Sequence, residues 1–212
     1  MMDISQWQGA WISDNHDIYY KSAPYFRRVF EIGKSVKSAR AYITVAGLYE
    51  LYVNGCRVGN HILDPMYTRY DRRNLYVTYD VTSQLQRGKN VMGVLLGNGW
   101  YNHQSLAVWN FHNAPWRNRP TFCLDLKIVY EDGSTEVVSS DKDWKTSTGP
   151  LISNSIYTGV HYDARQEQKG WSTIEFNDSG WEDVIYRSAP SQKIVAQQMH
   201  PIRVVDTVNT VK

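Results

Sequence analysis

The sequence has little of what marks a membrane, nucleic-acid-binding or disulfide-rich protein. Its longest apolar stretch, residues 91–97, is far shorter than the roughly 20 residues that a membrane-spanning helix needs. The formal net charge of +2 at pH 7 argues against a nucleic-acid-binding protein and against electrostatic anchoring at a membrane. The two cysteines, Cys56 and Cys123, lack any CxxC or Cys/His spacing. We therefore expect free thiols, with a disulfide as the alternative.

An export signal and catalytic motifs are also missing. The first residues lack the basic and apolar regions of a secretory signal. We therefore expect the protein in the cytoplasm, or in the periplasm or outside the cell if an export signal was removed. No phosphate-binding loop, dinucleotide fingerprint, HExxH or GxSxG motif occurs, and the six histidines are scattered without ligand spacing. We expect no catalytic residue in this chain.

Aromatic residues, in contrast, are abundant and make up 13% of the 212 residues. Aromatic residues favour strands, and a hydrophobic share of 42% is enough to form a substantial core. Apolar and polar residues alternate with a period of two along the chain. In residues 39–45, for example, Ala41, Ile43 and Val45 share one face. This pattern predicts an all-β protein.

The strongest turn signal is Asn54-Gly55, which separates residues 48–53 from residues 56–58. Both residues tolerate the positive φ that a two-residue type I′ hairpin turn requires. Asp132-Gly133 predicts a second hairpin, and we expect the last strand over residues 202–208.

Short strands with turn signals at this spacing are typical of a β-sandwich or jelly roll. No linker, internal repeat or low-complexity tract divides the chain. We therefore predict one antiparallel jelly-roll β-sandwich domain over residues 1–212.

A candidate binding surface follows the apolar run, in Gly97-Asn98-Gly99-Trp100-Tyr101. The two glycines allow a tight turn that presents Trp100 and Tyr101 at the rim of the sandwich. An indole face suits the C–H surface of a sugar, and the Asn98 amide offers a donor and an acceptor to a diol. The alternative is that Trp100 is a core residue that closes the end of the sandwich.

Two further segments carry candidate site residues. Trp116 and Trp109 lie in a long loop, residues 102–119, and either extend the aromatic surface or shield the sheet. Asp163 and Arg165 lie two residues apart, where they can form a structural ion pair. Alternatively, the Asp163 carboxylate can serve a calcium ion, which takes oxygen ligands.

Several of these segments give the chain a resemblance to a known family. The segments are Trp7-Gln-Gly-Ala-Trp-Ile12, Tyr25-Phe-Arg-Arg-Val-Phe30, Ala46-Gly-Leu-Tyr-Glu-Leu-Tyr-Val-Asn-Gly55, Tyr79-Asp-Val-Thr82, Gly97-Asn-Gly-Trp-Tyr101, Trp144-Lys145, Tyr157-Thr-Gly159, Tyr162-Asp-Ala-Arg165 and Gly170-Trp171. In this order they resemble the N-terminal region of bacterial α-L-rhamnosidases of glycoside hydrolase family 78. The resemblance implies a galactose-binding-like jelly roll ahead of the catalytic part. In that family the acid and base carboxylates of an inverting hydrolysis lie in a later (α/α)6 barrel, which this chain lacks.

In some members of the family the corresponding module binds L-rhamnose through calcium, as carbohydrate-binding module family 67. The usual Gly-Glu-x-Tyr-Asp-Ala-Arg segment is matched here by residues 159–165, with Val160 in place of the glutamate. Calcium remains an alternative that the loss of this carboxylate disfavours, and no other cofactor is expected. The resulting set of sugar-binding candidates is Asn98, Trp100, Tyr101, Trp116, His161, Asp163 and Arg165.

The residues and the resemblance favour a non-catalytic accessory module that binds rhamnose-containing glycans or packs against a catalytic domain. One alternative is hydrolase activity, which requires a pair of facing carboxylates and which the resemblance places in a full α-L-rhamnosidase. The other is an interaction or dimerisation module whose exposed aromatic residues are buried against a second copy or another subunit.

Overall fold

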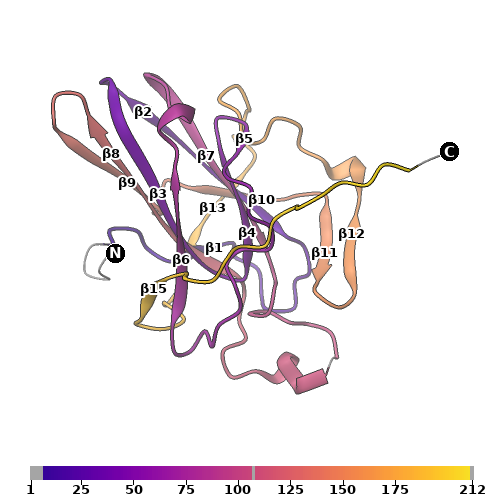
Figure 1. Ribbon diagram of the computed structural model, residues 1–212. Helices are drawn as coiled ribbons and strands as arrows, with labels where there is room; N and C mark the ends of the chain where they lie inside the picture. Colours follow the sequence, from indigo (N-terminus) through magenta and orange to yellow (C-terminus); the bar gives the residue numbers. More distant parts are fainter. Residues whose placement is uncertain (1–6, 107, 211–212) are drawn as a thin grey trace.

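The computed structural model describes residues 7–106 and 108–210 and consists of two β-sheets with a separate hairpin (Figure 1). The seven-stranded sheet has the order β14 (Ile185–Tyr186), β1 (Ile12–Ser13), β8 (Thr121–Tyr130), β3 (Val36–Ala46), β6 (Asn74–Asp80) and β15 (Ile194–Ala196), with β9 (Thr135–Ser139) also paired to β8. The six-stranded sheet has the order β13 (Glu182–Asp183), β10 (Lys145–Thr148), β2 (Pro24–Ile32), β7 (Gly88–Gly97), β4 (Leu48–Val53) and β5 (Cys56–Arg57). The hairpin pairs β11 (Leu151–Ser155) with β12 (Gly159–Tyr162).

Helical structure is confined to short 3-10 segments in the described ranges: η2 (Thr82–Gln84), η3 (Val108–Asn113) and η4 (Ala164–Gln166). None of the described segments is a helix long and apolar enough to cross a membrane. The prediction of an all-β sandwich is confirmed. The first six residues, in which the sequence shows no export signal, lie outside the described residues.

The end of the chain differs from the prediction. β15 pairs in parallel with β6, whereas the other strand pairs in the two sheets are antiparallel. The expected strand over residues 202–208 is wrong, because only Ile202 forms a bridge, to Ile62. From residue 203 to residue 210 the described chain forms no strand or bridge, and Val205 is 96% exposed. This tail leads away from the sheets (Figure 1).

The Asn54-Gly55 hairpin forms as predicted. Asn54 and Gly55 have φ values of 49° and 83° and join β4 to β5. The Asn54 side chain accepts a hydrogen bond from the Val91 main-chain N–H at 2.8 Å and so fixes the turn to β7. In β4, Leu51 and Val53 are buried while Glu50 and Tyr52 are half-buried on the opposite face, which confirms the predicted register.

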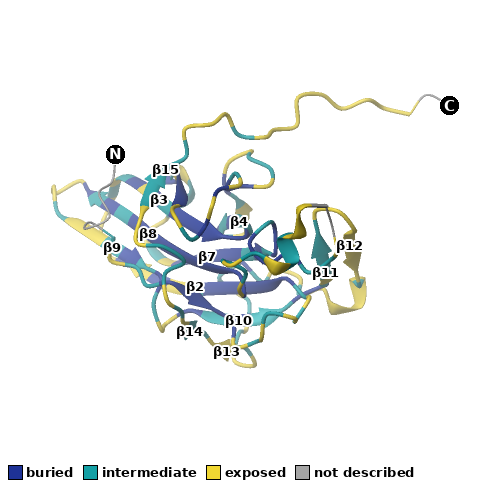
Figure 2. Cartoon of the chain, turned by 90° about the horizontal axis from the view of Figure 1, so that it is seen from below, coloured by how far each residue is buried: buried dark blue, intermediate teal, exposed yellow. Residues whose placement is uncertain are grey.

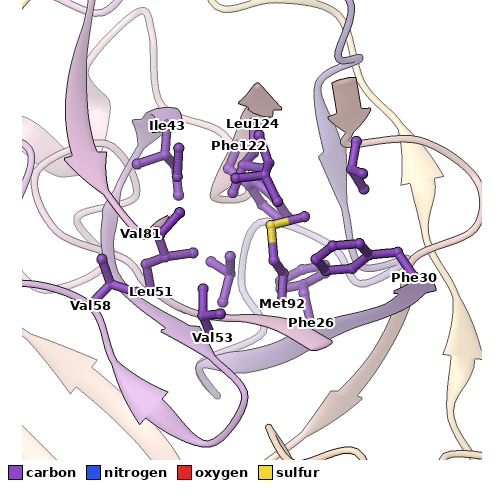
Figure 3. Close-up of a cluster of buried hydrophobic side chains, with 14 of the residues drawn as sticks. Phe26, Phe30, Ile43, Leu51, Val53, Val58, Val81, Met92, Phe122 and Leu124 are labelled. Carbon is purple, nitrogen blue, oxygen red and sulfur yellow. The ribbon is translucent and has the colours of Figure 1, made fainter. Parts of the chain in front are cut away.

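The core lies between the two sheets. Buried apolar side chains from β2, β4 and β7 meet those from β3 and β8 (Figure 3). β2, β7 and β8 are accordingly mostly dark blue, the colour of buried residues, in Figure 2. Phe122 on β8 contacts Phe26 on β2, with ring centroids 5.2 Å apart, and Trp144, at 5.3 Å. These edge-to-face contacts join the sheets, because Phe26 and Phe122 come from different ones.

The outer face of the six-stranded sheet is also covered. Trp171 lies over Gly93 of β7 and stacks on Tyr25 of β2, with ring centroids 4.3 Å apart. A Cβ atom at Gly93 would lie only 2.6 Å from Cζ3 of Trp171. A glycine is therefore needed at position 93 for the indole to approach the sheet this closely.

Candidate functional site

The turn after β7 uses its polar side chain for structure. Gly99 has a φ of 51°, and Asn98 is only 3% exposed. The Asn98 amide donates to the carbonyl oxygens of Lys21 and Asn154 at 3.4 and 3.3 Å, and its oxygen accepts from the Asn102 amide at 3.0 Å. The expectation that this amide meets a diol is therefore corrected: its hydrogen-bonding groups are occupied within the fold.

The two aromatic residues of the turn separate rather than lying together at the rim. Tyr101 is 4% exposed and packs edge-on against Tyr70, with ring centroids 5.1 Å apart. Burial raises the pKa of Tyr101 to about 12. The preceding residue, Trp100, is half-buried. The expectation of a paired Trp100–Tyr101 surface is thus corrected, since Tyr101 belongs to a small buried apolar group.

Trp100 lies at the centre of an aromatic cluster. We use this name for Tyr67, Trp100, His103, Phe111, Trp116 and Tyr157. The Trp100 ring centroid lies 5.1 Å from that of Phe111 and 5.6 Å from that of Tyr157. Trp116 joins through Phe111, at 6.1 Å. The structure therefore brings two of the predicted residues, Trp100 and Trp116, into one group.

The loop that carries Phe111 has an unusual tip. Trp109 has a φ of 73° and is 73% exposed, and Leu106 is 87% exposed. A left-handed backbone is rare for an aromatic residue and costs conformational energy. Trp109 therefore projects from the cluster instead of closing it, although its ring still meets Phe111 at 6.1 Å.

A cavity of about 270 Å³ opens beside the aromatic cluster. Its wall includes Gly97 at the end of β7, Gly99 from the turn that follows, and Ile156 and Val160 from the β11–β12 hairpin. The remaining lining is mostly apolar and comprises Ala23, Leu48, Tyr49, Glu50, Ile62, Leu63, Leu95, Leu96, Leu151, Asn154 and Ser155. The two segments that the sequence analysis selected separately thus meet at one cavity.

The cavity adjoins the aromatic cluster through the chain itself. Gly99 and Ile156 line the cavity, and each is followed directly by a ring of the cluster, Trp100 and Tyr157. Sequence reasoning did not select Tyr157 as a site residue, and among the wall residues it singled out Gly97, Gly99 and Val160. Tyr157 stood inside the family-like Tyr157-Thr-Gly159 segment, which was the one available signal.

The carboxylate of the cavity is Glu50. Its Oε2 accepts from the Tyr52 hydroxyl at 2.6 Å, and its Oε1 lies 3.3 Å from Nε of Arg57. Burial, together with the hydrogen bond to Glu50, raises the pKa of the Tyr52 hydroxyl. That hydroxyl therefore stays protonated and donates to Glu50.

The other predicted residues lie at the far end of the hairpin. Arg165 binds Asp163 through two hydrogen bonds of 2.8 and 2.7 Å, so the predicted ion pair is present. These bonds hold the pKa of the Asp163 carboxyl below its usual range. His161 is exposed on β12, and Val160, not these three side chains, faces the cavity.

The residues at this place do not fit a calcium ion. Both Asp163 oxygens are bound by Arg165, and Val160 offers no ligand atom. Across residues 7–106 and 108–210, no three His, Cys, Asp or Glu side chains are grouped to hold a metal ion.

A family model, curated relatives and solved structures each match this chain to α-L-rhamnosidases. The model of the α-L-rhamnosidase N-terminal domain matches residues 34–206. An α-L-rhamnosidase of Formosa agariphila is 40% identical over 186 residues, which are 85% of this chain and 19% of that protein. An α-L-rhamnosidase structure from Dictyoglumus thermophilum is similar with a TM-score of 0.89 and 38% identity, covering 100% of this chain and 24% of that one. The Streptomyces avermitilis enzyme, solved in complex with L-rhamnose, has a TM-score of 0.83 and 35% identity, covering 88% of this chain and 18% of that one.

The chain spans 18% to 24% of the length of these three proteins. The structural match to the Dictyoglumus thermophilum enzyme covers the whole of this chain, and the family model covers the part that follows β2. The chain therefore belongs to the family of α-L-rhamnosidase N-terminal domains.

Proposed function

We propose that this domain is a non-catalytic module of an α-L-rhamnosidase and that it binds L-rhamnose or a related sugar beside Trp100. The observation that carries this proposal is the cavity of about 270 Å³, whose lining residues Gly99 and Ile156 directly precede Trp100 and Tyr157, two rings 5.6 Å apart. The L-rhamnose bound in the similar Streptomyces avermitilis enzyme supports the class of ligand.

The chemistry of the cavity suits a deoxy sugar. L-rhamnose carries a methyl group where most hexoses carry a hydroxymethyl group, and the apolar side chains of Leu48, Ile156 and Val160 can remove that methyl from water. The half-buried ring of Trp100 and the exposed ring of Tyr157 offer surfaces for the C–H groups of the sugar. Glu50 retains acceptor sites beyond the two that it uses, so it can accept from a sugar hydroxyl.

The carboxylates favour binding over catalysis. Glu50 is the one acidic residue among the described residues that line this cavity. Glycoside hydrolysis uses two carboxyl groups on opposite sides of the scissile bond. This lining supports a module that holds a sugar without cleaving it.

Titration with L-rhamnose, followed by NMR, is expected to move the side-chain signals of Trp100 and Tyr157 at millimolar sugar. The affinity is weak because a shallow site excludes little water from a monosaccharide. Tyr157→Ala is expected to raise the dissociation constant for L-rhamnose about fivefold, which corresponds to the free energy of one aromatic contact. Tyr186→Ala is the matched control, since Tyr186 is 60% exposed against 48% for Tyr157 and lies on β14, away from the cavity.

Calcium is expected to leave this titration unchanged, because Arg165 occupies the Asp163 carboxylate and Val160 supplies no oxygen. The measurement is the same titration with excess calcium and with a chelator. A sugar affinity that rises with calcium would contradict this expectation while leaving sugar binding itself intact.

Protein docking is a second candidate, favoured by the exposed loop tip of Leu106 and Trp109. Docking of a protein at this loop tip does not depend on a ligand in the cavity beside Trp100. Absence of any shift at millimolar L-rhamnose, together with a dimeric mass in light scattering, would exclude the first proposal and support this one.

A further inference from the structure

A second cavity, of about 160 Å³, has a lining that shares no residue with the cavity beside Trp100. We call it the His16 pocket. The pocket lies where the chain leaves β1 and passes the ends of β10 and β13. The lining residues whose polar side-chain groups are discussed below are Asp14, His16, Tyr20, Thr148 and Glu182. Its volume equals that of roughly five water molecules at about 30 Å³ each, which is enough for one small ligand.

The floor of the His16 pocket is a buried ion pair. Asp14 and Arg119 are 1% and 0% exposed. Nε and Nη2 of Arg119 donate to the two Asp14 oxygens at 2.7 and 2.6 Å. Burial raises the pKa of the Asp14 carboxyl, but the hydrogen bonds and charge of Arg119 outweigh burial and lower it. Asp14 is therefore ionised and acts only as an acceptor.

The ionised Asp14 carboxylate determines which ring nitrogen of His16 donates a hydrogen bond and which one can accept. Nδ1 of His16 lies 3.0 Å from Oδ2 of Asp14, so Nδ1 carries the proton and donates it to the carboxylate. With the proton on Nδ1, Nε2 of the imidazole form is a hydrogen-bond acceptor. The ring is held in place by Tyr20, which stacks on it at 3.7 Å with an interplanar angle of 11°.

Four polar groups of the pocket have no partner among the described residues. They are Nε2 of His16, the hydroxyls of Tyr20 and Thr148, and the carboxylate of Glu182. They come from separate stretches of chain: the segment after β1, the end of β10, and β13. A few polar groups that converge on a preformed cavity from different elements are typical of small-molecule sites.

We propose that the His16 pocket is a second binding site, which takes one neutral polyol, such as a single sugar residue. Two of its free groups, Nε2 of His16 and the Glu182 carboxylate, accept hydrogen bonds, and the two hydroxyls can donate or accept. Neighbouring hydroxyls of a polyol match this set, because each hydroxyl both donates and accepts.

The charges around the pocket favour a neutral ligand over an ion. Glu182 repels anions. Arg187 donates from Nη2 to the carbonyl oxygens of Asp14 and His16 at 3.3 and 3.0 Å, which places a positive charge next to the pocket and disfavours a cation. This inference is independent of the cavity beside Trp100, and the two sites are tested by different signals.

The test follows the imidazole nitrogen signals of His16 by NMR during titration of the 212-residue chain with L-rhamnose, D-galactose or glycerol. The His16→Gln spectrum assigns the signals. At least one of the three probes is expected to shift them at millimolar concentration. Glu182→Gln is expected to weaken that binding about tenfold, the effect of losing one hydrogen bond to a charged group.

Matched variants separate this site from others. Glu175→Gln removes an exposed carboxylate that does not line the pocket and is expected to leave the affinity unchanged. Tyr157→Ala weakens sugar binding beside Trp100 and is expected to leave the His16 shifts intact. The proposal is overturned if none of the probes moves the His16 signals, if Glu182→Gln binds as tightly as the parent, or if only zinc ions move them, which would indicate a metal site.

Discussion

Arg119→Ala is expected to lower the free energy of unfolding by about 3 kcal/mol, because it leaves the buried Asp14 carboxylate without the guanidinium that is paired with it. The same substitution removes the hydrogen bonds from Arg119 to the carbonyl oxygens of Tyr20 and Ser22, at 2.8 and 3.1 Å. Urea denaturation followed by tryptophan fluorescence measures the change. In a chain of this length the unfolding temperature should fall by roughly 6 to 12 °C.

Arg165→Ala is the matched control. Arg165 holds Asp163 in the same two-bond arrangement, at 2.8 and 2.7 Å, but its side chain is 88% exposed. Water replaces the lost hydrogen bonds at such a site, so no measurable change in stability is expected. Equal losses in the two variants would show that burial does not determine the strength of these pairs.

Phe122→Ala is expected to cost about 4 kcal/mol of unfolding free energy, because it empties a fully buried site between the sheets (Figure 3). The rings of Phe26 and Trp144 both lose an edge-to-face partner. Urea denaturation again provides the measurement, and the slope of the transition should stay constant if the fold is kept.

Phe122→Leu tests the origin of that loss, since it keeps most of the apolar volume and should cost about 1 kcal/mol. Tyr186→Ala, at a 60% exposed position, should have little effect. A Phe122→Ala variant as stable as Phe122→Leu would mean that the core refills the space, contrary to the packing described above.

The fold could be predicted from local patterns. Alternation in residues 39–45 identified the buried face of β3, and Asn54-Gly55 identified the turn after β4. Both features depend on neighbours in the sequence. The tail over residues 202–208 has the same strand-like composition, but strand formation depends on a neighbouring strand, which it lacks.

The candidate site could be predicted only in part. The turn at residues 97–101 does reach the cavity, but the burial of Asn98 depends on Lys21 and Asn154, which are far away in the sequence. A local motif cannot reveal whether an amide is already hydrogen-bonded by such distant groups. The His16 pocket depends in the same way on an ion pair between Asp14 and Arg119, 105 positions apart.

The close approach of Trp171 to Gly93 means that the residue type at one of these positions constrains the residue type at the other during evolution. Because a Cβ atom at position 93 would overlap the indole, a larger residue can be accepted there only when the indole is replaced or displaced. Homologous sequences should therefore covary at these two positions, with alanine or bulkier residues at 93 accompanying the loss of tryptophan at 171.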